Sequence, residues 1–330
     1  MNNMELATVY LPILDEIYKN EAKTAILEGD EATVKKDGYG NLKVAKLSMD
    51  GLGDFSRNSG YTQGSTSFVW ETIEWDKERS QDLRIDRLDN EENLELPFAK
   101  LSGEFIRTKV IPETDAARLA KLASTQGITF VNEALSSGAD VIAALRACTN
   151  AFNEAEVPKE NRILFITPTF LGLVKDLDTT KSKEVLAEFS TIIETPQTRM
   201  YTRITLNDGT SSYGYKKAAA EYKATTDAAV VEGKTYYTKN GDVYSAVAEP
   251  ATANIASYYE MTAAAGTNLN FLAVEKSAAV CAMNQYIKYF APDDDQNGDS
   301  HVFKYRNNNL YGHVYENKLA GIYASAAPSA

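Results

Sequence analysis

Residues 293–304 form the densest group of side chains in the sequence that could bind a metal ion. Asp293, Asp295 and Asn297 are followed by Gly298, which is the spacing at the start of a calcium-binding loop. The twelfth position of such a loop needs a bidentate glutamate, but this chain has Lys304 there. No helix is predicted before the segment. The pattern therefore favours a solvated acidic turn over a calcium site.

Other patterns that carry catalysis or bind cofactors are missing from the sequence. There is no glycine-rich phosphate loop, no GxSxG turn, no HExxH and no cysteine pair at zinc spacing. Glu91 and Glu92 are adjacent, so their carboxylates face apart as solvated charges usually do. Lys318 follows Asn317, and a lysine can bond covalently to an asparagine of another chain, but nothing positions the two groups. We predict that the chain is not an enzyme and needs no metal or cofactor.

The composition is that of a folded protein with an acidic excess. Of 330 residues, 44% are hydrophobic and 24% are charged, and the net charge is −12 at pH 7. Proteins that grip nucleic acid neutralise phosphates with lysine and arginine, so this charge argues against such a role. It does not exclude a protein that encloses nucleic acid without adhering to it.

The sequence predicts neither a membrane-spanning protein nor a disulfide-linked one. No run of twenty apolar residues predicts a membrane span, and the first residues lack the basic segment of a secretory signal. The two cysteines, Cys148 and Cys281, are far apart in sequence and are expected to be reduced core residues.

The first element that could organise these residues is a long amphipathic helix predicted over residues 90–124. Leu94, Phe98 and Phe105 recur at helical spacing along one stripe. Pro112 disfavours helical geometry at the residue before it, so we expect a kink or a short break there. At 1.5 Å per residue, about 35 residues give a rod of roughly 50 Å, longer than a compact domain usually needs. Taken alone, the pattern is typical of an ordinary long core helix.

The second element is an antiparallel β arm predicted over residues 44–88. Residues 50–64 hold four glycines and indicate an open tip. Alternating residues around Phe68 and Trp70 predict a strand, and residues 81–88 alternate again, so two or three strands are expected. Limbs of about 12 residues reach roughly 40 Å, and an isolated hairpin is marginal in water. The arm must lie either on its own domain or on a neighbouring subunit, and periodicity does not decide between them.

Residues 216–263 differ in composition from the rest, being rich in Ala, Thr and Tyr and poor in Leu. Two short strand-like segments flank Asn240 and Gly241, a pair typical of a tight hairpin turn. A buried strand pattern resumes at residues 269–274. We therefore predict a small all-β module inserted into a host domain at a surface loop.

The remaining segments mix short helices with strands, which predicts an α+β fold. Helices are expected over residues 15–27, 134–156, 168–177, 183–189 and 277–283, and strands over residues 162–166, 199–206, 285–290, 301–306, 310–316 and 319–324.

Four stretches of this chain carry a family likeness. They are SMDGLGDFSRNSGYTQG, VWETIEWDKERSQDLRIDRLDNEENLE, GEFIRTKVIPETDAARLAKLAS and VYENKLAGIYAS. In wording and order they resemble stretches of the major capsid proteins of tailed bacteriophages, in particular phages of Gram-positive bacteria, which have the Hong Kong 97-type fold. The resemblance covers nearly the whole chain except residues 216–263, and its motifs serve assembly rather than catalysis.

The resemblance implies a Hong Kong 97-like fold with a long spine helix, an extended β-hairpin arm and the inserted module. The implied parts are an N-terminal arm (1–43), an extended loop over an adjacent subunit (44–88), a peripheral domain with the spine helix (89–129 and 301–330), an axial domain (130–300) and the module (216–263). The expected assembly-interface residues are Asp54, Phe55, Arg57, Tyr61, Trp70, Trp75 and Arg79.

The function implied by the resemblance is that of a structural subunit of an icosahedral capsid. The expected partners are other copies in hexamers and pentamers, a portal and a decoration protein. Many relatives carry a long cleaved scaffolding segment, whereas this chain starts almost on the arm, so a separate scaffold protein or none is expected. The shell would enclose double-stranded DNA without specific binding. It would belong to the virion and be assembled in the host cytoplasm.

The alternative function is that of a soluble binding module. The tyrosine-rich residues 216–263 would then recognise carbohydrate or a cell surface. This alternative predicts a monodisperse monomer with affinity for glycans, whereas the capsid hypothesis predicts particles of tens of nanometres.

Overall fold

The computed structural model describes residues 22–29, 34–36, 42–55, 57, 60–87, 102–177, 179–294 and 298–328. By its contacts the chain divides into two compact units. Unit 1 comprises Met1–Arg118 and Lys276–Lys318, and unit 2 comprises Leu119–Glu275 and Leu319–Ala330. The expected peripheral and axial domains have different bounds: residues 276–300 were grouped with the axial domain but lie in unit 1, and residues 119–129 and 319–330 were grouped with the peripheral domain but lie in unit 2.

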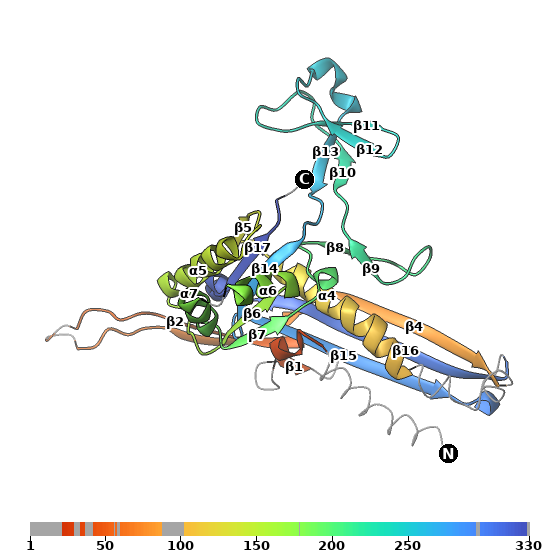
Figure 1. Cartoon of the computed structure of the whole chain (residues 1–330), viewed down its shortest axis with the longest axis horizontal. Coiled ribbons are helices and arrows are strands. Elements are labelled where there is room, and N and C mark those ends of the chain that lie inside the picture. Colours follow the sequence, from red (N-terminus) through yellow and green to blue (C-terminus); the bar gives the residue numbers. More distant parts are fainter. Residues whose placement is uncertain are drawn as a thin grey trace. The chain divides into compact units, whose positions relative to one another are not determined.

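The main sheet of unit 1 has three long antiparallel strands (Figure 1). Strand β16 (Ser300–Val314) lies between β15 (Ala279–Phe290) and β4 (Lys77–Asp86). The helix expected over residues 277–283 is wrong, and the two strands expected over residues 301–306 and 310–316 are parts of the single strand β16. Cross-strand pairing of β15 with β16, such as Ala279 with Val314, overrides the weak local helical pattern.

The spine helix runs without a break through Pro112, so of the expected kink or short break the break is absent, and a π-helical turn lies at this point instead. Residues 102–105 are helical, a π-helical turn η2 (Ile106–Val110) follows, and α4 (Ile111–Ala123) continues the helix. Ile111 has helical dihedral angles, and its N–H bonds to the carbonyl of Ile106, five residues back. Pro112 has no N–H, and its ring would clash with a carbonyl four residues earlier, so a wider turn accommodates it. The predicted start of this helix, at residues 90–101, lies outside the described residues.

The apolar stripe of the spine helix packs on the main sheet of unit 1. Ile106, Val110 and Ile111 are buried in one cluster with Phe303 and Tyr305 of β16. Only part of the predicted stripe is buried: Ile111 is, whereas Phe105 is partly buried and Thr108 is exposed.

The predicted arm is a two-stranded hairpin. Strand β2 (Leu42–Met49) pairs antiparallel with β3 (Thr66–Ile73), and the short β1 (Val34–Lys36) pairs with the other side of β2. The third predicted strand does not join the arm, because residues 77–86 pair with β16 along their whole length. That pairing places Leu83 against the core of unit 1, which the free arm could not do.

Unit 2 contains a five-stranded sheet covered by helices. The strand order is β5 (Thr129–Asn132), β17 (Ile322–Ala326), β14 (Leu269–Glu275), β6 (Arg162–Ile166) and β7 (Thr191–Glu194). The helices are α5 (Gly138–Glu154), α6 (Pro168–Asp176) and α7 (Thr180–Ala187). Buried residues of the sheet and helices form one core, which confirms the strands expected at residues 162–166 and 269–274.

Short elements connect these layers. They are the 3₁₀ turns η1 (Ala25–Leu27), η3 (Gln197–Arg199), η5 (Pro292–Asp294) and η6 (Glu316–Gly321), and the paired strands β8 (Ile204–Leu206) and β9 (Tyr215–Lys217). The strand expected over residues 199–206 is thus shorter, and the one expected from residue 319 begins at Ile322.

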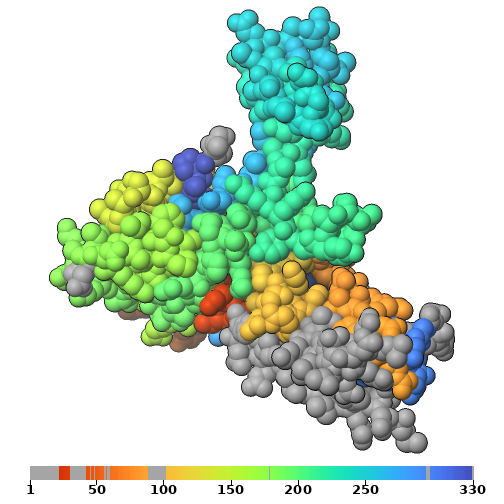
Figure 2. Space-filling view, turned by 45° about the vertical axis from the view of Figure 1, so that its right-hand side comes forward, coloured from red at the N-terminus to blue at the C-terminus, as the bar shows by residue number. Residues whose placement is uncertain are grey.

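The inserted module of unit 2 is a separate four-stranded sheet, seen as the cyan lobe in Figure 2. Its order is β10 (Glu221–Ala224), β13 (Tyr259–Ala263), β11 (Tyr237–Asn240) and β12 (Val243–Ala246), with the turn η4 (Thr252–Ser257) before β13. The predicted hairpin is present, but Asn240 pairs with Val243, so its loop is Gly241 and Asp242.

Candidate assembly surfaces

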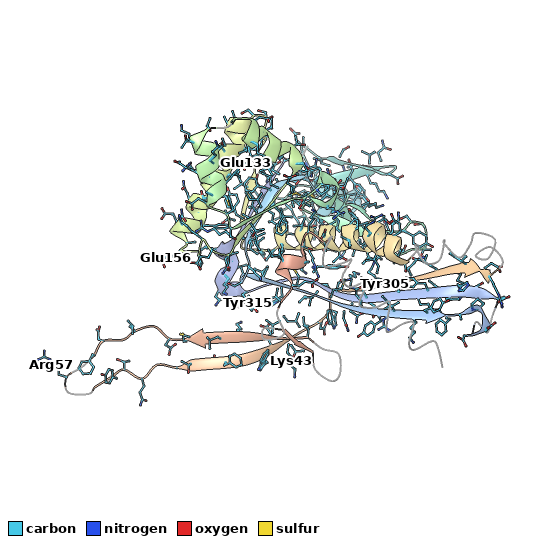
Figure 3. All side chains as sticks on the ribbon, turned by 60° about the horizontal axis from the view of Figure 1, so that its bottom comes forward. Lys43, Arg57, Glu133, Glu156, Tyr305 and Tyr315 are labelled. Carbon is cyan, nitrogen blue, oxygen red and sulfur yellow. The ribbon has the colours of Figure 1, made fainter. Side chains whose placement is uncertain are left out.

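The hairpin is anchored at its base and exposed beyond it. Leu42 and Val44 of β2 are fully buried, and they lie on the same face of the hairpin as Ile73. Further along β2, the side chains of Lys46, Leu47 and Met49 are all exposed. Figure 3 shows Lys43 near the base and Arg57 at the outer end of the hairpin. The outer part of the arm therefore has little apolar contact with its own unit.

Exposed apolar side chains concentrate on this arm. Of the fourteen large hydrophobic side chains that are strongly exposed among the described residues, seven lie between residues 47 and 69. They are Leu47, Met49, Leu52, Phe55, Tyr61, Phe68 and Val69. Scattered exposed apolar residues are ordinary, but a concentration on one projecting element indicates a surface that another molecule covers.

Strand register places the largest of these side chains on one face of the hairpin. Leu47 is directly opposite Phe68, and Met49 is opposite Thr66 two residues further along β2. Phe68 is also in edge-to-face contact with Trp70, with ring centroids 5.6 Å apart. Leu47, Met49 and Phe68 are 54%, 63% and 59% exposed, so this face, which we call the arm face, is open.

The tip of the arm is ordered by its own hydrogen bonds. The Asp50 N–H donates to the Ser65 carbonyl at 3.0 Å, and the Ser65 N–H donates to Asp50 Oδ2 at 2.7 Å. Thr62 Oγ1 donates to the carbonyl oxygen of Asp54 at 2.9 Å. The rings of Phe55 and Tyr61 meet edge to face at 5.1 Å, and both remain strongly exposed. The tip thus presents two aromatic rings without burying them.

The seven residues predicted for the interface fall into three places. Asp54, Phe55, Arg57 and Tyr61 lie at the tip, Trp70 lies on the arm face, and Trp75 and Arg79 lie where the chain returns to the main sheet. Sequence reasoning missed Leu47, Met49 and Leu52 as candidates. The signal that could have identified the first two is their alternation with Lys46 and Ser48 before the glycine-rich tip.

Arg79 binds within its own unit. Its Nε donates to Glu113 Oε1 at 2.7 Å, and its Nη2 donates to Glu113 Oε2 at 3.1 Å. This two-point pairing fastens β4 to the first turn of α4, and both side chains are mostly buried. The geometry therefore gives Arg79 a positioning role, and its predicted part in assembly stays a prediction.

A buried polar clamp, which sequence reasoning missed, holds the first described residues on the spine helix. Asp115 accepts hydrogen bonds from the Lys23 N–H at 3.1 Å, the Thr24 N–H at 3.0 Å and Thr24 Oγ1 at 2.6 Å. Arg118 Nη2 donates to Glu28 Oε1 at 2.9 Å. Asp115 and Arg118 are fully buried. Carboxylates of this kind usually face solvent, so sequence alone gives little sign of such a clamp.

The described residues hold no group of three or more His, Cys, Asp or Glu side chains that could bind a metal. In the acidic segment, Asp293 and Asp299 lie 3.4 Å and 3.8 Å from Arg87 Nη1, while residues 295–297 lie outside the described part. Lys318 Nζ donates to the carbonyl and hydroxyl oxygens of Ser277 at 3.2 Å and 2.8 Å.

Both cysteines are buried free thiols. Burial raises the pKa of the Cys281 thiol to about 11 and also raises that of Cys148, so neither forms a reactive thiolate near neutral pH. Among the described residues, no helix is long and apolar enough to cross a membrane.

Comparison by structure, but not by sequence, finds proteins similar to this chain. No protein-family model and no curated protein sequence matches it. The capsid structure of cyanophage P-SCSP1u matches with a TM-score of 0.50 at 12% identity, over 88% of this chain and 84% of that one. A chain of Mycobacterium phage Che8 has a TM-score of 0.49 at 13% identity, over 91% and 89%. The mature capsid of bacteriophage PhiM1 has a TM-score of 0.47 at 12% identity, over 89% and 84%. The chain therefore has an α+β fold of the phage-capsid type, as the sequence resemblance implied.

Proposed function

We propose that this chain is the structural subunit of a bacteriophage capsid, which assembles with further copies of itself into an icosahedral shell. The observation that carries the proposal is the arm face, where Leu47, Met49 and Phe68 are all more than half exposed. A hairpin of two strands has too little core to remain apart from other surfaces. A neighbouring copy offers a surface that recurs at every position of a shell.

Head-to-tail contacts of this kind suit a closed assembly. An arm that docks on a different surface of the next copy makes a heterologous contact, and such contacts close into rings or shells. Each contact is weak alone, but repetition around a closed structure makes the whole stable. The phage-capsid fold supports this geometry, whereas no comparison supports a soluble binding protein as the function of the whole chain.

The parts of the chain receive their roles from this proposal. The hairpin over residues 44–73 reaches the adjacent subunit, and the spine helix with its sheet forms the peripheral domain. The main sheet of unit 2 forms the axial domain around the five-fold and six-fold centres, and the module at residues 216–263 projects from it. In this proposal Asp54, Phe55, Arg57, Tyr61 and Trp70 contact the neighbour directly.

The charge of the chain fits a container for nucleic acid. A net charge of −12 repels phosphate groups, so packaged double-stranded DNA does not adhere strongly to the wall. The proposal places the protein in the virion, assembled in the host cytoplasm with a portal, a scaffold and a decoration protein as partners. It assigns the chain no catalytic role.

Electron microscopy of the purified protein tests this proposal. The expected result is closed particles of tens of nanometres, formed on concentration or on co-expression with a scaffold protein. Sedimentation of the same sample should then show a fast boundary. A sample that stays monomeric at all concentrations and with every scaffold candidate would contradict the proposal.

A further inference from the structure

The inserted module has two sheet faces that differ sharply in how their tyrosines are used. On one face, Tyr236 and Tyr258 are buried with Ile255 in the small core of the module. Tyr236 Oη donates to Asp227 Oδ2 at 2.6 Å, and Tyr258 Oη accepts from the Ala251 N–H at 3.2 Å. This face is closed, and its hydroxyl groups are satisfied.

The other face carries four tyrosines that form one continuous cluster, which we call the tyrosine face. Tyr237 lies opposite Tyr259, and the same face continues two residues along each strand. Tyr222 stacks on Tyr244 with ring centroids 4.0 Å apart, and contacts Tyr237 edge to face at 4.9 Å. Tyr244 contacts Tyr259 edge to face at 5.2 Å. All four side chains are partly exposed.

The hydroxyl groups of the tyrosine face make no hydrogen bond to any residue in the described part of the chain, in contrast to those of Tyr236 and Tyr258. Each Tyr hydroxyl can donate one hydrogen bond and accept others. An occupant that covered them with an apolar surface would leave them unsatisfied, which is costly. A ligand on this face must therefore form hydrogen bonds with the tyrosine hydroxyl groups as well as contact the rings.

The charge of the module indicates an uncharged occupant. Residues 216–263 contain five lysines and six acidic residues, a net charge of −1 in a chain that carries −12. In the cross-strand rows that hold the four tyrosines, Lys239 is the one charged residue, and its Nζ lies 5.6 Å from the Tyr244 ring centroid. Ala224 and Ala246 lie beside the rings in these rows, and the uncharged Met261, which is 40% exposed, lies opposite Tyr222.

We propose that the tyrosine face binds a neutral glycan. Sugar rings offer apolar C–H faces to aromatic rings and several hydroxyl groups to unpaired tyrosine hydroxyls, with no charge to compensate. Sites lined by aromatic rings with a few polar groups are the usual form of small-ligand sites. The proposal goes beyond the shell function and does not depend on it.

Two substitutions at neighbouring positions test the proposal in the full-length protein. Ala246→Arg places a long charged side chain on the tyrosine face, and Ser245→Arg places the same side chain on the opposite face of β12. Both positions are exposed, so both variants should keep the module folded. The probes are immobilised neutral polysaccharides (mannan, glucan and galactan), with an acidic polysaccharide, hyaluronan, as comparison.

The expected result is that at least one neutral polysaccharide binds, that Ala246→Arg weakens its binding tenfold or more, and that Ser245→Arg leaves it unchanged. Tyr222→Phe with Tyr244→Phe keeps both rings, and each lost hydrogen bond should weaken binding about fivefold. Tyr213→Phe, at an exposed tyrosine outside the module, is the control. No binding to any neutral polysaccharide, equal effects of the two arginine variants, or binding of hyaluronan alone would overturn the proposal. Particle formation by each variant is measured in parallel, so a failure of the shell function is recognised separately.

Discussion

At the scale of single residues, Asp115 contributes most clearly to the order of unit 1. This buried carboxylate accepts three hydrogen bonds from Lys23 and Thr24. Asp115→Asn replaces one acceptor oxygen by a donor, which cannot bond to the N–H groups that face it. We expect the free energy of unfolding to fall by about 1–3 kcal/mol. Chemical denaturation measures this change, with the exposed Asp242→Asn as a control that should unfold like the parent.

His313 gives the base of the arm a predictable response to acid. Burial lowers the pKa of His313 below its usual value, and the charge of Lys46 reinforces this shift. The negative charges of Glu71, Asp76 and Glu316 oppose it. The unfolded chain therefore binds the proton more readily than the folded chain. His313 therefore contributes fully to the free energy of unfolding above the unfolded-state pKa of about 6.5. This contribution is lost as the pH falls from there through the lower pKa of the folded state.

The measurement for this residue is the midpoint of thermal unfolding between pH 7.5 and pH 5.5. His313→Gln cannot take up the proton, so the variant should lose less stability over this interval than the parent does. Equal pH dependence in the two proteins would show that His313 does not contribute.

At the scale of elements, the hairpin tip is separable from the fold. Asp50 and Ser65 bond to each other directly, so residues 51–64 can be replaced by Asn-Gly, which closes a two-residue hairpin turn. We expect the subunit to keep its circular dichroism spectrum and its unfolding midpoint within a few degrees, because no core residue is removed. The same variant should form no particles by electron microscopy. Normal particles would show that the tip is not needed for assembly.

Sequence patterns predicted those elements whose buried residues recur at a regular spacing. They failed for elements whose secondary structure depends on pairing with a strand that is distant in sequence. The buried strand β14 and the helix α5, with Val141, Leu145 and Cys148 on one side, follow directly from their periodicity. Residues 277–283 were predicted helical, but residues 279–283 pair with β16, 26 to 35 residues further along the chain. The π turn that accommodates Pro112 was likewise not distinguished from a kink or a break by the sequence pattern.

The candidate surface could be predicted only in part, for the same reason. The glycines of residues 50–64 and the alternation after them indicated an exposed arm with aromatic residues. Whether Arg79 points to solvent or to Glu113 depends on the contact of β4 with α4, which no local pattern reveals. The closed and open faces of the module depend likewise on which tyrosines the loop before β11 covers.

At the scale of the whole molecule, the account depends on the arm lying on another copy. A shell can be stable although each contact between copies is weak, because the same contact is repeated many times. The arm face provides exposed apolar surface of the kind that is buried in such contacts. A photo-crosslinking amino acid at position 68 reports directly what the arm touches, because this position is 59% exposed on the arm face.

The most direct measurement uses particles assembled from equal amounts of unlabelled and ¹⁵N-labelled protein carrying this cross-linker. Mass spectrometry then separates cross-links within one chain, which have one isotope, from cross-links between copies, half of which are mixed. The account predicts mixed-isotope pairs at position 68, and predicts that they disappear from dispersed subunits. Cross-links of a single isotope only, within particles, would contradict it.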